Sequence, residues 1–145
     1  ILDGITDTKN FGAIVRSAEC LGVDAIIISK SGSSPINGET IKSSSGGIFN
    51  VPICKVDHIK DSLFFLKDNA VNIIASDDKA SLSLYEYNFK LKNAIIMGSE
   101  GVGINKSVLK LCDQSVNIPL HGKISSLNVS VATGIILSEI KRQKN

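Results

Sequence analysis

The stretch Ile95-Ile96-Met97-Gly98-Ser99-Glu100-Gly101-Val102-Gly103-Ile104 joins an apolar run to three closely spaced glycines. Such an apolar run is typical of a buried strand in a parallel sheet. The glycines follow where the strand would end, and ligands of open α/β sheets bind outside the carboxyl ends of the strands. The stretch therefore predicts either a ligand-binding loop or an ordinary glycine-rich turn.

The spacing of these glycines disfavours two nucleotide-binding motifs. It reads GxxGxG, whereas a Rossmann dinucleotide site has GxGxxG after its first strand and a P-loop has a lysine directly after its glycines. The chain has Thr6–Gly12 after its first expected strand, and Ile104 follows the last glycine. A nucleotide-binding oxidoreductase of the Rossmann type is therefore the weaker alternative.

The remaining sequence alternates short β-branched runs with helical patterns, which predicts one α/β domain with a parallel sheet over residues 1–145. No apolar run approaches the ~20 residues that span a bilayer. Two segments, Asn37-Gly38 and Ser43–Gly47, are typical of turns or loops. Strands are expected at Ile1–Ile5, Asp24–Ser29, Val51–Lys55, Val71–Ser76, Ala94–Gly98 and Ser115–Pro119, and helices at Asn10–Leu21, Ile59–Asn69, Lys106–Cys112 and Ser126–Lys141.

The composition narrows the class of protein. With 43% hydrophobic and 21% charged residues, the chain can bury a core. Its formal net charge of +2 neither forbids nor indicates a nucleic-acid partner. Cys20, Cys54 and Cys112 are widely separated and form no CxxC pair, and of the two histidines only His58, four positions after Cys54, is close to one of them. We therefore expect no metal site, no disulfide framework and a reducing, cytoplasmic location.

A second polar segment, Asn10-Phe11-Gly12-Ala13-Ile14-Val15-Arg16-Ser17-Ala18, follows the first expected strand. Asn10 can cap a helix, Gly12 permits close backbone approach, and Arg16 follows within two helical turns. Only two arginines occur in the chain, which makes Arg16 a candidate functional residue. The alternative is a capped helix that carries one solvated arginine.

A third segment, Ile118–Ala132, passes from a strand through a polar loop into a helix. Ser125 or Ser126 can cap this helix as a plain N-cap, but capping explains one serine and leaves Asn128 and Ser130 unexplained. Polar residues at a helix start suit a polar ligand, because free backbone N–H groups point outward there.

Together, the three segments resemble the motifs of the SpoU/TrmH class of RNA ribose 2′-O-methyltransferases. The motifs appear in order, as Asn10–Ala18, Met97–Gly103, and Ile118-Pro119-Leu120 with Ser126–Ala132. Leu2–Asp7 and Ala132–Ile135 are most similar to the bacterial RlmB branch, which methylates a guanosine ribose in 23S rRNA. Members of that branch usually carry a small N-terminal RNA-binding domain. The chain starts at Ile1 and has its only methionine at position 97, so we expect that such a domain is absent from it.

The resemblance implies a three-layer α/β fold with a deep C-terminal trefoil knot, which periodicity does not reveal. It also implies a homodimer whose active site is completed at the subunit interface. S-adenosylmethionine is the implied cofactor, bound between the second and third motifs. The residues expected to bind it are Met97, Gly98, Ile118, Leu120, Ser126 and Leu127.

The expected reaction moves a methyl group from a sulfonium to a ribose hydroxyl, which must lose its proton. The family resemblance identifies Arg16 as the residue that activates the hydroxyl, whereas a guanidinium stays protonated in proteins. Arg16 therefore acts either as a base or, charged, as a stabiliser of the developing alkoxide. Asn10 and Glu100 are expected to orient Arg16 or the ribose, with Glu100 as its counter-charge, and Asn128 completes the catalytic set.

Other candidates and alternatives remain open. Lys42 and Lys123 are candidate RNA phosphate contacts, and His121 is expected to be a loop histidine without a catalytic role. The main alternatives are a transfer-RNA methyltransferase of the same family and a non-catalytic RNA-binding module. The intact set of Asn10, Glu100 and the other polar motif residues argues against the second.

Overall fold

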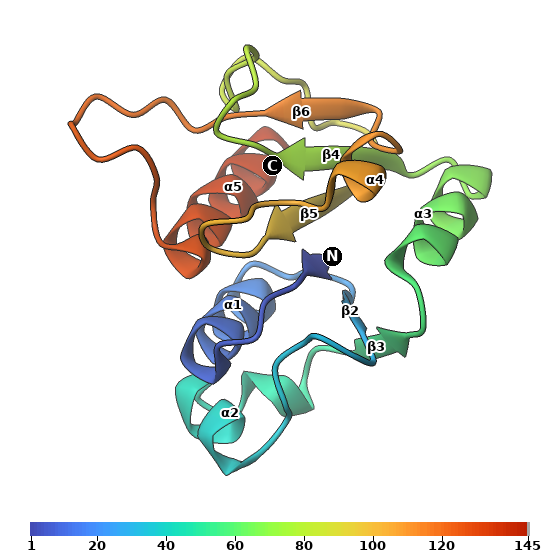
Figure 1. Cartoon of the computed structure of the whole chain (residues 1–145), viewed down its shortest axis with the longest axis vertical. Coiled ribbons are helices and arrows are strands. Elements are labelled where there is room, and N and C mark those ends of the chain that lie inside the picture. The colour runs from blue at the N-terminus through green and yellow to red at the C-terminus, as the bar shows by residue number, and fades with distance from the viewer. Residues whose placement is uncertain (145) are drawn as a thin grey trace.

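A six-stranded parallel sheet forms the centre of the computed structural model, which describes residues 1–144 (Figure 1). The strand order is β3-β2-β1-β5-β4-β6. The short β1 pairs with β5, with Leu2 opposite Met97 and Asp3 opposite Gly98. The chain therefore leaves β1 and β5 at neighbouring points of one sheet edge. The strands are β1 (Leu2–Asp3), β2 (Ile26–Ser29), β3 (Ile53–Val56), β4 (Asn72–Ser76), β5 (Asn93–Gly98) and β6 (Gln114–Val116).

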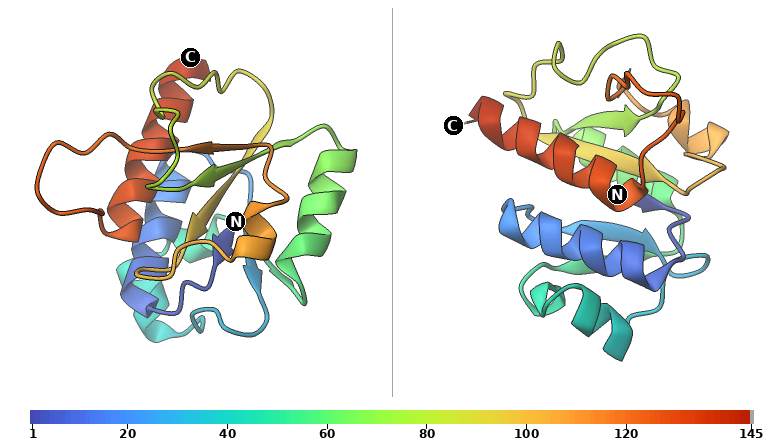
Figure 2. Two further views of the ribbon diagram at one scale, coloured as in Figure 1. Left: turned by 45° about the horizontal axis from the view of Figure 1, so that its top comes forward. Right: turned by 90° about the vertical axis from the view of Figure 1, so that its left-hand side faces the viewer.

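Helices cover both faces of this sheet, with α1 and α5 side by side on one face and α3 on the other (Figure 2). Each face has its own apolar cluster: Ile14 and Ile136 belong to the first, and Leu63 and Ile96 to the second. Burial on both faces is what a parallel sheet requires. The helices are α1 (Thr8–Cys20), α2 (Gly38–Ser43), the 3-10 turn η1 (Gly47–Phe49), α3 (Ile59–Asp68), α4 (Lys106–Leu109) and α5 (Val129–Lys144).

All six expected strands and all four expected helices are present, with ends that differ by a few residues. The expectation that Asn37-Gly38 forms a turn is wrong, because α2 begins there. The Asn37 side chain accepts hydrogen bonds from Glu39 N (3.0 Å) and Thr40 N (3.2 Å), and the Thr40 side chain accepts one from Asn37 N (3.3 Å). This reciprocal capping stabilises a helix of only six residues.

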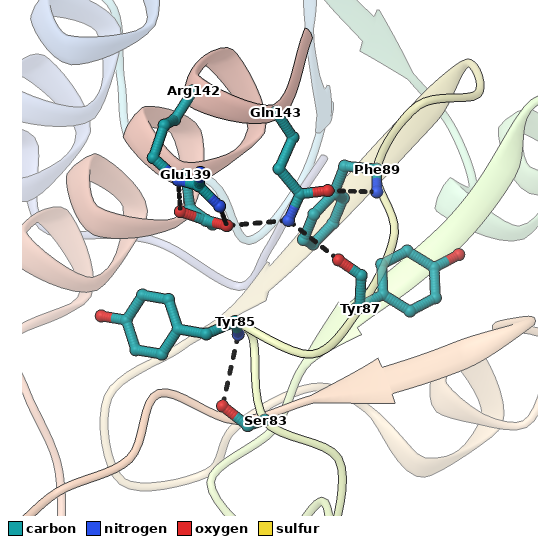
Figure 3. Close-up of polar contacts among 7 residues, drawn as sticks. All are labelled: Ser83, Tyr85, Tyr87, Phe89, Glu139, Arg142 and Gln143. Atoms are coloured by element: carbon teal, nitrogen blue, oxygen red, sulfur yellow. Dashed lines mark hydrogen bonds and ion pairs between the residues drawn. The ribbon is translucent and has the colours of Figure 1, made fainter.

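The long connection from β4 to β5 contains no helix, and side chains near the end of α5 hold it in place (Figure 3). Gln143 accepts a hydrogen bond from Phe89 N (2.8 Å) and donates to Tyr87 O (2.9 Å). It also donates to Glu139 (2.7 Å), which Arg142 contacts through two bonds of 2.8 Å. These bonds lower the pKa of Glu139 from its ordinary 4.5 to about 2.

Among residues 1–144, no helix is long and apolar enough to cross a membrane.

Candidate active site

Three polar side chains, one from each motif, meet at the edge of the sheet where β1 and β5 end. Asn128 Nδ2 donates to Glu100 Oε1 at 2.8 Å and to Asn10 Oδ1 at 2.9 Å. Asn10 Nδ2 lies 3.4 Å from the same Glu100 oxygen. Residues separated by 118 and 28 positions in the sequence are thus in direct contact. We call Asn10, Glu100 and Asn128 the amide–carboxylate cluster.

Helix starts place two members of this cluster. Asp7, and not Asn10, caps α1: its side chain accepts a hydrogen bond from Asn10 N at 2.7 Å. Asn128, and not Ser125 or Ser126, caps α5, since its Oδ1 accepts from Ser130 N at 2.9 Å. The caps that the sequence allows at Asn10 and at Ser125 or Ser126 are therefore not the ones that form. Asn10 in the first turn of α1 and Asn128 before α5 both lie where backbone N–H groups carry a partial positive charge.

The glycine-rich motif forms a tight turn that places Glu100. Gly103 N donates to Ser99 O at 2.8 Å, and Gly101 and Gly103 have φ angles of +82° and +76°. A Cβ on Gly98 would lie 2.2 Å from Gly103 C, so the turn folds back directly over the end of β5. The unusual GxxGxG spacing follows from this turn, because each glycine has a conformation or a contact that excludes a side chain.

Glu100 Oε1 accepts hydrogen bonds from the two asparagine side chains and from Val129 N, the latter at 3.4 Å. Within residues 1–144, its Oε2 accepts no hydrogen bond, and the residue is exposed. One carboxylate oxygen is therefore held in place, while the other faces solvent and can meet a ligand.

The segment of residues 118–127 has backbone groups that could hold a cofactor. It forms no helix or strand, and within residues 1–144 its amides donate to no other backbone group. Leu120 and Leu127 are 38% and 37% exposed. Free amide and carbonyl groups beside exposed leucines fit an adenosine-like ligand, which has an apolar ring face and a polar ring edge. The donor set therefore suits S-adenosylmethionine.

The other residues expected to bind the cofactor occupy mixed positions. Ile118 is half-buried and packs against the core, and Ser126 is exposed in the same segment. Gly98 lies under the turn described above. Met97 is only 4% exposed and belongs to the core of the α1 and α5 face, so its side chain does not reach the surface.

Arg16 does not join the amide–carboxylate cluster. It is exposed, and within residues 1–144 its side chain makes no hydrogen bond or ion pair. Six residues of helix place it ~9 Å further along α1 than Asn10. The expected pairing of Glu100 with Arg16 is therefore wrong within one chain, since the carboxylate contacts the two asparagines instead.

Lys42, Lys123 and His121 are also exposed, and no hydrogen bond from their side chains occurs in the described part of the chain. Sequence reasoning missed two aspartates that shape the site. Asp7 caps α1, and Asp3 accepts a hydrogen bond from Asn105 N at 2.7 Å, which fastens the far end of the glycine-rich turn to β1. The pattern of an aspartate three residues before Asn10 is a capping signal that could have identified the first.

Residues 1–138 match the model of the SpoU rRNA Methylase family. The chain belongs to this family. It is 40% identical over 144 residues to the 23S rRNA (guanosine-2′-O-)-methyltransferase RlmB of Yersinia pestis, covering 99% of this chain and 58% of that protein. It is 38% identical over 145 residues to RlmB of Escherichia coli K12, covering 100% of this chain and 60% of that protein. The chain thus spans about three fifths of the length of these two relatives.

Solved structures of SpoU proteins share the fold. The SpoU methyltransferase AviRb of Streptomyces viridochromogenes, in complex with AdoMet, has a TM-score of 0.92 at 26% identity, covering 99% of this chain and 58% of that one. The A. aeolicus TrmH/SpoU tRNA modifying enzyme has a TM-score of 0.89 at 32% identity, covering 99% of this chain and 73% of that one.

Among residues 1–144, no group of three or more His, Cys, Asp or Glu side chains could hold a metal ion.

Proposed function

We propose that this chain is the catalytic part of an S-adenosylmethionine-dependent methyltransferase that modifies the 2′-hydroxyl of a guanosine ribose in 23S rRNA. The observation that carries the proposal is the contact between Asn10, Glu100 and Asn128, which unites three motifs at one edge of the sheet. The sequence identity to two RlmB proteins supports guanosine as the modified nucleotide and 23S rRNA as the substrate. The AdoMet complex of AviRb supports the cofactor.

S-adenosylmethionine held in this site would supply an electrophilic methyl group on a sulfonium. The protein must remove the hydroxyl proton and stabilise the negative charge that develops on that oxygen. Glu100 Oε2 is free to accept a hydrogen bond from the ribose, while Asn10 and Asn128 hold the other oxygen. Such positioning lowers the barrier without any change in the reacting groups.

We assign Arg16 to charge stabilisation in a site shared between two copies of the chain. A guanidinium remains protonated and can hold a phosphate and a developing alkoxide in a fixed fork geometry. Because Arg16 is exposed and lies ~9 Å along the helix from Asn10, it can serve the site of a second copy. The exposed faces of α1 and α5, where Val131 is 52% exposed, are the proposed dimer surface.

The backbone of the segment of residues 118–127, with Gly98, Leu120, Ser126 and Leu127, is proposed to hold the cofactor. Ile118 contributes through its backbone, because its side chain packs against the core. We also propose the trefoil knot that the family resemblance implies, and a cytoplasmic location, which suits three free cysteines.

Transfer of tritiated methyl groups to RNA tests this function. The chain is incubated with labelled S-adenosylmethionine and unmethylated 23S rRNA or transfer RNA, and the modified nucleoside is identified by mass spectrometry after digestion. We expect 2′-O-methylguanosine from 23S rRNA. Label only in transfer RNA would favour a function like that of the A. aeolicus tRNA modifying enzyme. Cofactor binding without methyl transfer to any RNA would refute the proposal that the chain is a methyltransferase.

Substitution of the cluster tests the mechanism. Glu100→Gln keeps the size of the side chain but removes its charge, and Asn128→Asp introduces a second carboxylate beside it. Both are expected to lower kcat by ~100-fold, because they alter a group that positions the reacting atoms. Arg16→Lys is expected to lose a comparable factor, since an ammonium cannot reproduce the fork. Near-normal turnover in all three variants would refute the assignment.

A further inference from the structure

An apolar pocket of about 440 Å³ opens on the surface, and none of the residues that line it belongs to the amide–carboxylate cluster. It lies between α2, η1 and β3, and Phe49 on its wall is 74% exposed. Single exposed apolar residues are common, but a contiguous apolar patch is characteristic of a binding surface. The lining residues are Ile36, Ile41, Ile48, Phe49, Asn50, Val51, Pro52 and Ile53.

The turn that carries Phe49 packs against the part of α1 that carries Arg16. A Cβ on Gly47 would lie 3.6 Å from Arg16 Cα, so the two backbones are in close contact. Asn50 Nδ2 donates to Glu19 Oε1 at 3.2 Å, which fastens the end of η1 to the next turn of α1. Phe49, two residues after Gly47, therefore lies on a backbone segment that is fastened to α1 at the turn that carries Arg16.

Two cationic residues are close in the sequence to residues that line this pocket. Lys42 follows Ile41 directly in α2, and Lys55 lies on the same face of β3 as Ile53 because alternate strand residues share a face. Both lysines are exposed and lie outside every ion pair in the described part of the chain.

The acidic side chains near these lysines are fewer than the cationic ones. In α2, Glu39 lies ~200° around the helix from Ile41. On α1, Glu19 keeps its negative charge beside Asn50, to which it is hydrogen-bonded, and is outnumbered by the three cations Arg16, Lys42 and Lys55. An apolar floor with an aromatic ring, with cationic side chains nearby, complements a nucleobase with its phosphates.

We propose that Phe49 is a stacking platform for an unpaired RNA base next to the methylated ribose, and that Lys42 and Lys55 contact the phosphates of that nucleotide. This inference rests on the proposed function, because it places the RNA strand across η1 from the site that Arg16 serves. An enzyme that acts on a ribose must bind its nucleotide in an unpaired or extruded form. The bases on either side then lose their stacking partners, and an exposed aromatic ring replaces one of them.

Substitutions of Phe49, compared by RNA affinity, test the platform. Phe49→Ala is expected to weaken binding of single-stranded RNA by about 5- to 100-fold, which corresponds to ~1–3 kcal/mol at 1.4 kcal/mol per tenfold. Phe49→Leu keeps an apolar side chain but no ring and is expected to lose most of that factor. Phe49→Trp is expected to retain the affinity. Phe65→Ala is the matched control, because Phe65 is 68% exposed on α3, on the other face of the sheet.

Fluorescence of 2-aminopurine, placed at successive positions of the RNA, reports stacking directly. We expect quenching on binding at one position, and its loss in Phe49→Ala but not in Phe65→Ala. Calorimetric titration with S-adenosylmethionine is expected to give the same affinity in every variant. Full RNA affinity in Phe49→Ala, or in Phe49→Leu, would overturn the platform.

Two further outcomes separate the possible failures. If Phe49→Ala converts a dimer into a monomer in sedimentation while RNA affinity is unchanged, the pocket binds a second copy and the proposal is wrong. If the wild-type chain quenches the probe but methylates no RNA, the stacking platform stands and the proposed function fails. If the wild type methylates RNA and all variants bind RNA with equal affinity, the proposed function stands and the stacking platform fails.

Discussion

Replacing Gly98 by alanine would place a methyl group where the structure has no room for one. The added Cβ would lie 2.2 Å from Gly103 C and 2.3 Å from Ile104 N, both backbone atoms of the glycine-rich turn. Carbon atoms pack best at ~3.5 Å or more, so the turn would have to move by ~1.3 Å. The strain is purely steric, because Gly98 is not among the glycines with positive φ.

The size of the effect follows from what this turn carries. Glu100 lies in the turn, and its Oε1 depends on hydrogen bonds of 2.8 Å and 3.4 Å to the two asparagines of the cluster. A displacement of about 1 Å in a group that positions substrate can cost ~100-fold in rate. Overpacking of this kind also destabilises a protein by ~1–3 kcal/mol. We therefore expect Gly98→Ala to lose ~100-fold in kcat/KM and to unfold at a lower urea concentration.

Gly134→Ala in α5 is the matched control for this experiment. The nearest atom to its added Cβ would be Ser17 Oγ at 3.9 Å, an ordinary contact distance. Alanine is favoured over glycine in a helix by ~0.5–1 kcal/mol, so this variant should be slightly more stable and fully active. Methyl transfer to RNA and urea denaturation measure both quantities. If Gly98→Ala matches the wild type within twofold in kcat/KM and in stability, the steric reasoning is wrong.

Three further outcomes can be measured on the same chain. The pKa of Glu139 is lowered to about 2, so its stabilising contribution is present above about pH 4.5 and is lost as the pH falls toward 2. Urea denaturation should therefore show a steeper loss of stability below pH 4.5 in the wild type than in Glu139→Gln, and equal slopes would contradict the role of its bonds to Arg142. Gly12→Ala would place a Cβ 1.8 Å from Ser43 Oγ and 2.7 Å from its Cβ, and it should lose ~1–3 kcal/mol of unfolding free energy, partly restored by Ser43→Gly. Burial raises the pKa of Cys112 to about 11, so mass spectrometry after brief iodoacetamide treatment at pH 7.5 should find this thiol unmodified while the two exposed cysteines react.

Much of the fold could be predicted from local patterns. The apolar runs predict all six strands, and the helical periodicities predict α1, α3, α4 and α5. These elements bury their apolar residues in a regular repeat. The α2 helix was missed because its stability comes from side-chain caps at Asn37 and Thr40 and not from an apolar repeat. The helix starts at Thr8 and Val129 were misplaced for the same reason, since several polar residues compete for a cap and only the folded chain selects one.

The sequence by itself determined which polar residues are candidates for a site, because the chemistry of Asn10, Glu100 and Asn128 stands out against an apolar strand and helix pattern. Only the tertiary structure decided which of them touch. The parallel register of β1 and β5 brings the ends of two motifs together, and the α5 cap adds the third. The tertiary structure also places Arg16 apart from Glu100, although their opposite charges predict an ion pair. Contacts between residues about 100 positions apart depend on strand order and register, and no local pattern in the sequence encodes these.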